Sequence, residues 1–140
     1  MKRVRILSSI LLFAMTCHGQ DITIRVVDDR TQKPLKGISV LLRIDCESSN
    51  RPKALVQKTD SSGQTVFPAI SLSKEPVCIN LFSTAYRYAP HTLDLVLVAP
   101  DQAPRYKSLN PIVTTLPAIE TFHVQKRSFF ERLAFIFHGD

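Results

Sequence analysis

Apolar and polar residues alternate along most of this chain, in short runs that end at turn-forming residues. Asp21–Asp28 reads DITIRVVD, and Gly37–Asp45 and His91–Val98 follow the same two-residue period. This period places the apolar side chains on one face of a β-strand. The remaining predicted strands are Ala54–Thr59, Gln64–Ile70, Val77–Ser83 and Ile119–Lys126.

The residues between these runs favour an all-β fold. Nine Pro against four Gly disfavour a helical bundle. No connecting segment has both the length and the periodicity of a crossover helix, so a parallel βαβ fold is not expected. The pattern predicts a seven-stranded antiparallel Greek-key β-sandwich with a short C-terminal helix.

Residues 1–19 have the pattern of an export signal. Three basic residues precede the apolar run Ile6–Met15, which is well short of the roughly 20 residues that span a bilayer. We expect a signal peptide cleaved after Gly19, or alternatively after Thr16, and a secreted or periplasmic protein. An uncleaved signal anchor is the other interpretation.

Cys17 raises the alternative of a lipoprotein with lipid attached to this side chain. A lipidated cysteine usually follows a Leu and then small residues that end in Gly or Ala. Here the preceding residues are Ala14, Met15 and Thr16. We therefore do not expect lipidation.

The leader also accounts for half of the net charge. The whole chain carries +6, and three of its 18 basic residues but none of its 12 acidic residues lie in residues 1–19. The remaining chain carries +3, which is ordinary for its size. This charge gives no reason to expect nucleic acid as a partner.

Two cysteines remain after the leader, Cys46 and Cys78. In an oxidising compartment two buried cysteines usually pair. The alternation argues against a bond, because Cys46 continues the apolar face of its strand whereas Cys78 shares a face with Asn80 and Phe82. A disulfide and two separate buried thiols both remain open.

The sequence contains no recognisable catalytic or metal-binding pattern. His91, His123 and His138 do not have the spacing of metal ligands. A G-x-S-x-G nucleophile elbow is also missing. We expect no catalytic residue, no metal, no cofactor and no enzymatic activity.

Two loops carry candidate binding residues. The first could form an exposed aromatic platform for a sugar or a peptide, and the second could be a recognition tip in the proline-rich stretch Ala99–Pro111. The candidates in the first loop are Tyr86, Arg87, Tyr88 and His91, and those in the second are Arg105 and Tyr106. The alternatives are a packed loop for the first set and a solvated loop for the second.

Residues 128–140 differ from the rest of the chain and predict a helix. Ser128 and Glu131 have the spacing of a capping box, and Gly139 can end the helix. The apolar face that we expect to dock consists of Phe129, Phe130, Leu133 and Phe137. The helix could pack on the sandwich, or it could bind a membrane surface or a partner protein.

Three short motifs between residues 22 and 98 resemble the carboxypeptidase regulatory-like domain. They are Val26-Val27-Asp28, Pro34-Leu35-Lys36-Gly37-Ile38-Ser39-Val40 and Thr59-Asp60-Ser61-Ser62-Gly63. These match the family pattern V-x-D, P-L-x-G-x-x-V and T-D-x-x-G. The family has a Gly-Tyr pair late in the domain, where this chain reads Ser83-Thr84-Ala85-Tyr86.

The resemblance implies a β-sandwich of the prealbumin-like or carbohydrate-binding-like type over residues 20–127. In that fold Asp60 and Gly63 would form a hairpin between the third and fourth strands. The resemblance further implies a non-catalytic binding or structural module of the cell envelope, with a carbohydrate or an envelope protein as partner. Together with the compact leader, it suggests a bacterial source.

Overall fold

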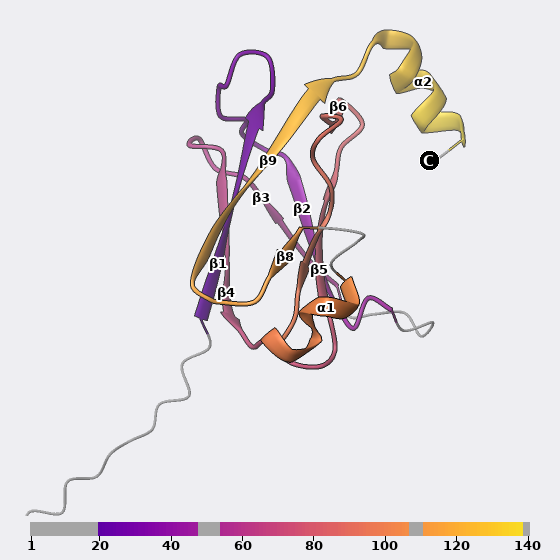
Figure 1. The fold of residues 1–140 in the computed structure, drawn as a ribbon. Helices are drawn as coiled ribbons and strands as arrows, with labels where there is room; N and C mark the ends of the chain where they lie inside the picture. The colour runs from indigo at the N-terminus through magenta and orange to yellow at the C-terminus, as the bar shows by residue number, and fades with distance from the viewer. Residues whose placement is uncertain (1–19, 48–53, 107–110, 139–140) are drawn as a thin grey trace, which may run out of the picture.

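The computed structural model describes residues 20–47, 54–106 and 111–138. The predicted signal peptide and Cys17 lie outside these residues. The described residues form nine strands in two sheets and a few short helices (Figure 1).

The first sheet has four strands and the second has five. The first, in the order β4-β1-β9-β6, contains Gln64–Ile70, Gln20–Asp28, Ala118–Lys126 and Tyr86–Tyr88. The second, in the order β3-β2-β5-β7-β8, contains Ala54–Lys58, Ser39–Ile44, Val77–Phe82, Leu95–Leu97 and Ile112–Val113. The helices are η1 (Pro100–Gln102), α1 (Ala103–Tyr106) and α2 (Phe129–His138).

One hydrophobic core lies between the two sheets and holds them together as a sandwich. Alternate residues of β1, among them Ile22 and Ile24, are fully buried in it, as is Val124 of β9. Val40 and Leu42 of β2 close the core from the other sheet. Each such side chain stabilises the fold by about 1.5–3 kcal/mol. These buried positions of β1, β2 and β9 are the ones that the alternation predicts, whereas β7 is buried on both faces, at Val96 as well as at Leu95 and Leu97.

The sheets are mixed, which corrects the prediction of seven antiparallel strands. β1 pairs in parallel with β9, and β7 pairs in parallel with β8. The strands beyond the predicted seven are β6, expected to be a loop, and the two-residue β8. Alternation shows which face of a strand is buried, but it does not show which strand lies beside it or in which direction that strand runs.

The connection between β7 and β8 makes their parallel pairing possible. Parallel neighbours need a crossover of about a dozen residues or more, and residues 98–111 supply it with η1 and α1 inside. Tyr106 of α1 is buried against Val96 and Val98 in a second, smaller cluster. Residues 100–106, which the sequence predicts to be part of a loop, are therefore helical and pack on the second sheet through Tyr106.

The turn at Asp60 forms as predicted, but it does not make a hairpin. Oδ1 of Asp60 accepts hydrogen bonds from the backbone N–H groups of Ser62 (2.8 Å) and Gln64 (3.0 Å). The hydrogen bond from the Ser62 hydroxyl, followed by those from the backbone, lowers the pKa of Asp60. The turn joins β3 in one sheet to β4 in the other, because β3 pairs with β2 and β4 pairs with β1.

Cys46 and Cys78 form a disulfide, with their Cα atoms 5.9 Å apart. The alternation does not apply at Cys46, because β2 ends at Ile44 and Asp45 has a φ of 53°. This left-handed residue changes the direction of the chain. Cys46 therefore reaches Cys78, which packs with the smaller cluster rather than with the central core.

Candidate functional site

A groove of about 290 Å³ lies where the end of β5, strand β6 and helix α2 meet. Aromatic and basic side chains are prominent in its lining. They include Phe82, Tyr86, Arg87, Tyr88, Arg127 and Phe135. Three of these, Tyr86, Arg87 and Tyr88, are candidates from the sequence, and the structure places them together on β6 rather than in a loop.

Tyr88 is held by hydrogen bonds on both sides of its hydroxyl group. Its Oη donates to Oδ1 of Asp94 (2.6 Å) and accepts from the backbone N–H of Leu81 (2.7 Å). Its ring packs on Phe122, with the centroids 5.6 Å apart. Burial, followed by the hydrogen bond to Asp94, raises the pKa of Tyr88. This side chain therefore ties β6 to β5 and contributes a rigid wall to the groove.

Helix α2 begins with the capping box that the sequence predicts. Glu131 N–H donates to Oγ of Ser128 (3.3 Å), and Ser128 N–H donates to Oε2 of Glu131 (2.6 Å). These hydrogen bonds to Ser128 are the main cause of a lowered pKa at Glu131. Among the residues that the structure describes, no helix is long and apolar enough to cross a membrane.

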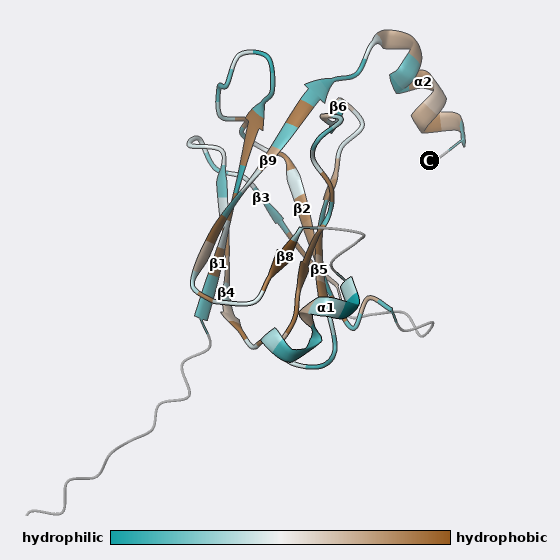
Figure 2. Ribbon diagram, in the orientation of Figure 1, coloured by the Kyte–Doolittle hydropathy of each residue, from teal (hydrophilic) through white to brown (hydrophobic). Residues whose placement is uncertain are grey.

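Helix α2 contacts the sandwich through Phe135 and through two basic side chains near it. The centroid of the Phe135 ring lies 6.1 Å from that of Phe82, and the Arg127 guanidinium stacks over the Phe135 ring, 4.4 Å from its centroid. Arg87 also pairs with Glu131 at 3.0 Å. The candidate docking residues of α2 are 38–80% exposed and do not pack on the sandwich; much of the α2 ribbon has the colour of hydrophobic residues (Figure 2). The candidate docking residues are Phe129, Phe130, Leu133 and Phe137.

The second predicted loop does not join this groove. Tyr106 is buried, so its ring is not displayed on the surface. Arg105 is exposed and lies 3.8 Å from a carboxylate oxygen of Glu47. An exposed pair of this kind contributes at most about 1 kcal/mol to stability.

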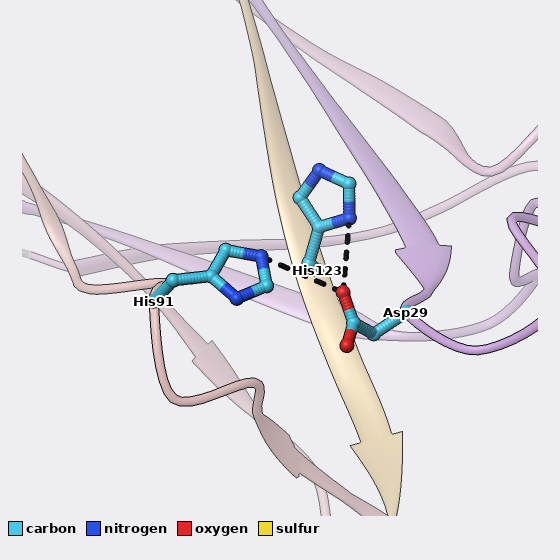
Figure 3. Close-up of side chains that lie close together, drawn as sticks. All are labelled: Asp29, His91 and His123. Atoms are coloured by element: carbon cyan, nitrogen blue, oxygen red, sulfur yellow. Dashed lines mark ion pairs between the residues drawn. The ribbon is translucent and has the colours of Figure 1, made fainter.

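A separate cluster brings Asp29, His91 and His123 together on the outer face of the first sheet (Figure 3). His123 lies on the central strand β9, between the buried residues Phe122 and Val124. Its side chain therefore points away from the core. Asp29 follows the end of β1 on one side of β9, and His91 follows β6 on the other side.

The carboxylate of Asp29 lies between the two imidazoles. Its Oδ1 is 3.5 Å from Nε2 of His91 and 3.6 Å from Nδ1 of His123, and the centroids of the two imidazole rings are 5.3 Å apart. Its Oδ2 accepts a hydrogen bond from Nε2 of Gln125 (3.4 Å). The cluster opens to solvent at His91, whose side chain is 62% exposed, while those of Asp29 and His123 are 25% and 29% exposed.

Sequence reasoning missed this cluster because its members come from three distant segments. The spacing of His91 and His123 argued against a metal site, but sequence separation does not keep them apart in space. Their proximity depends on the register of β9 with its neighbours, which pairs Val27 with His123 and Tyr88 with Val124. The one signal available in the sequence was an outward-facing histidine on a strand with a buried apolar face.

No family model and no curated protein matches this chain, so the resemblance to the carboxypeptidase regulatory-like domain remains a prediction. Among solved structures, the chain is similar to a group B streptococcus pilus 2b backbone protein, with a TM-score of 0.49 and 13% identity over 79% of this chain and 42% of that chain. It is also similar to the shaft pilin SpaA of Lactobacillus rhamnosus GG, with a TM-score of 0.49 and 13% identity over 78% and 48% of the two chains. An intradiol ring-cleavage dioxygenase from Tetranychus urticae has a TM-score of 0.43 and 12% identity over 76% and 80%. This chain spans less than half of either pilin chain.

Proposed function

We propose that this chain is an exported, non-catalytic β-sandwich module of the cell envelope that binds a carbohydrate or an envelope protein. The observation that carries the proposal is the disulfide between Cys46 and Cys78. Disulfides persist in oxidising compartments and are rare in the cytosol. The predicted signal peptide in residues 1–19 supports the same compartment from an independent part of the chain.

Export is tested by fractionating a bacterial host that expresses the full chain. The protein should be recovered outside the cytoplasm, with the mass of a chain that begins at Gln20 or, for the alternative cleavage, at Cys17. Reduction should raise that mass by two hydrogen atoms. A full-length chain with free thiols in the cytoplasm would contradict the proposal.

The groove beside β6 is the candidate binding surface. It combines an exposed aromatic ring, Phe82, with the guanidinium of Arg87, and its volume is close to the smallest usual for ligand sites. Tyr88 is fixed in its wall by two hydrogen bonds, so the groove needs little reorganisation on binding.

Binding to envelope polysaccharides and to envelope protein extracts tests this surface. Phe82→Ala should weaken binding, whereas Val56→Ala on the edge strand β3 should not. The two side chains have similar exposed fractions, 61% and 59%, and circular dichroism checks that both variants fold. Equal binding by both variants would exclude the groove as the binding surface.

A second candidate function is docking through helix α2 to a bilayer or a partner. The observation that favours it is the exposed apolar face of this helix, which includes Phe130 and Phe137. An amphipathic helix of this kind can bury its apolar face at a membrane surface.

Liposome flotation separates the two candidates. The full chain should float if α2 docks to bilayers, and a chain that ends at Lys126 should not. Phe130→Ser with Phe137→Ser provides a variant that keeps the helix, and circular dichroism checks its fold. If the full chain stays with the soluble fraction, the membrane role is wrong.

A further inference from the structure

We propose that Asp29, His91 and His123 form a binding site for one divalent transition-metal ion, for which Zn²⁺ is the appropriate probe. Two imidazole nitrogens and one carboxylate oxygen are a donor set that zinc accepts. The three donor atoms all lie within 4.8 Å of one another. This inference goes beyond the proposed function and does not rest on it.

The distances fit a single ion among the three side chains. Zinc ligands at 2.0–2.2 Å in a tetrahedral arrangement are about 3.3–3.6 Å from one another. Oδ1 of Asp29 lies 3.5 Å from the His91 nitrogen and 3.6 Å from the His123 nitrogen. The two imidazole nitrogens lie within 4.8 Å of each other, and the side chain of His91, which is 62% exposed, can rotate to adjust that separation.

An unsatisfied polar atom in the cluster is an independent indication of a ligand. Nδ1 of His123 is buried and has no hydrogen-bond partner within the described residues. At 3.6 Å, the oxygen of Asp29 is beyond hydrogen-bonding distance. Buried polar atoms usually have a partner, and a metal ion between this nitrogen and Asp29 would supply it.

Backbone hydrogen bonds already hold the three segments in place. Asp29 N–H donates to Val124 O (2.8 Å), which fixes the end of β1 beside β9. Ala89 N–H donates to His123 O (2.9 Å), and Thr92 N–H donates to Ala89 O (2.9 Å), which closes the turn that carries His91. The ion therefore needs side-chain adjustment only.

Gln125 has the role of a positioning residue. Its Nε2 donates to Oδ2 of Asp29 (3.4 Å), which leaves Oδ1 directed toward both histidines. Hydrogen bonds that orient a metal-binding carboxylate typically change metal affinity by about 10–100-fold. Two histidines and one aspartate also leave a fourth zinc position for water or for a donor atom from a partner.

The test titrates Zn²⁺ into the untagged full chain by isothermal titration calorimetry and follows the histidine side chains by nuclear magnetic resonance. We expect one ion per chain, with shifts at His91 and His123 and none at His138. His91→Ala and Asp29→Asn should each lower the affinity more than about tenfold, and Gln125→Ala by about tenfold.

His138→Ala is the matched control, because it removes an exposed histidine of helix α2, remote in sequence and fold from the cluster. It should leave the affinity for Zn²⁺ unchanged. His91 is itself exposed, so His91→Ala should keep the fold, which circular dichroism verifies. Two results would overturn the site: no Zn²⁺ binding by the unaltered chain, or binding that persists at the same affinity in His91→Ala and Asp29→Asn.

Discussion

Removal of the disulfide should destabilise the protein by an amount that follows from the length of the loop that it closes. Cys46 and Cys78 are 32 residues apart. In the chain-entropy model, a loop of that length contributes about 3–4 kcal/mol by restricting the unfolded chain. A domain of this size has a total stability of about 5–15 kcal/mol. The double variant Cys46→Ala with Cys78→Ala should therefore lose a large share of it.

Urea unfolding of the double variant measures the loss, with reduced wild-type protein as a second form without the bond. The free energy of unfolding should fall by about 3–4 kcal/mol, and Tm should fall by roughly 10–20 °C. The m-value should rise, because an unfolded chain without the bond exposes more surface.

The mass of the wild-type protein first confirms that its disulfide is formed. If the double variant then loses less than about 1 kcal/mol of unfolding free energy relative to it, this reasoning is refuted. A large loss with an unchanged m-value would also argue against an effect on the unfolded chain. It would point instead to the packing of Cys78 against the smaller cluster of Val96, Val98 and Tyr106.

Three further predictions concern single residues. In urea unfolding, Gly63→Ala should destabilise the protein more than Gly37→Ala. Both glycines have a positive φ, which costs about 1–2 kcal/mol with a side chain, but only at Gly63 would a Cβ lie 2.8 Å from the backbone of β1. Equal losses of unfolding free energy in the two variants would contradict this prediction. Tyr88→Phe should cost about 1–3 kcal/mol, because Asp94 and an amide of β5 lose their partner, and an unchanged free energy of unfolding would show that these bonds contribute nothing. The lowered pKa of Asp60 contributes stability that is present above about pH 4 and lost as the pH falls. In a plot of unfolding free energy against pH, Asp60→Asn should therefore show a smaller fall at acid pH than the wild-type protein.

The alternation of side chains determined a large part of the core. Ile22, Ile24 and Val40 are buried as predicted, because a strand places every second side chain on the same face. Local chemistry was equally readable: the capping box at Ser128 and the turn at Asp60 both depend on residues within four positions of each other.

Features that depend on strand partners could not be read in this way. The period-two pattern of β1 and β9 is the same whether they pair in parallel or antiparallel, and the strand β6 is too short to show a period. The change of direction at Asp45, which brings Cys46 to Cys78, depends on one backbone angle. The direction of strand pairing, the position of β6 and the turn at Asp45 are therefore determined by the packing of whole sheets.

The cluster of Asp29, His91 and His123 shows this division most directly. The sequence determined that His123 faces outward, because its neighbours Phe122 and Val124 belong to the core. Only the tertiary structure decided what lies beside it, because β9 inserts between β1 and β6 and brings the ends of both strands to the same place. Side-chain periodicity is a local property of the chain, whereas the neighbours of a strand are determined by the free energy of the whole sandwich.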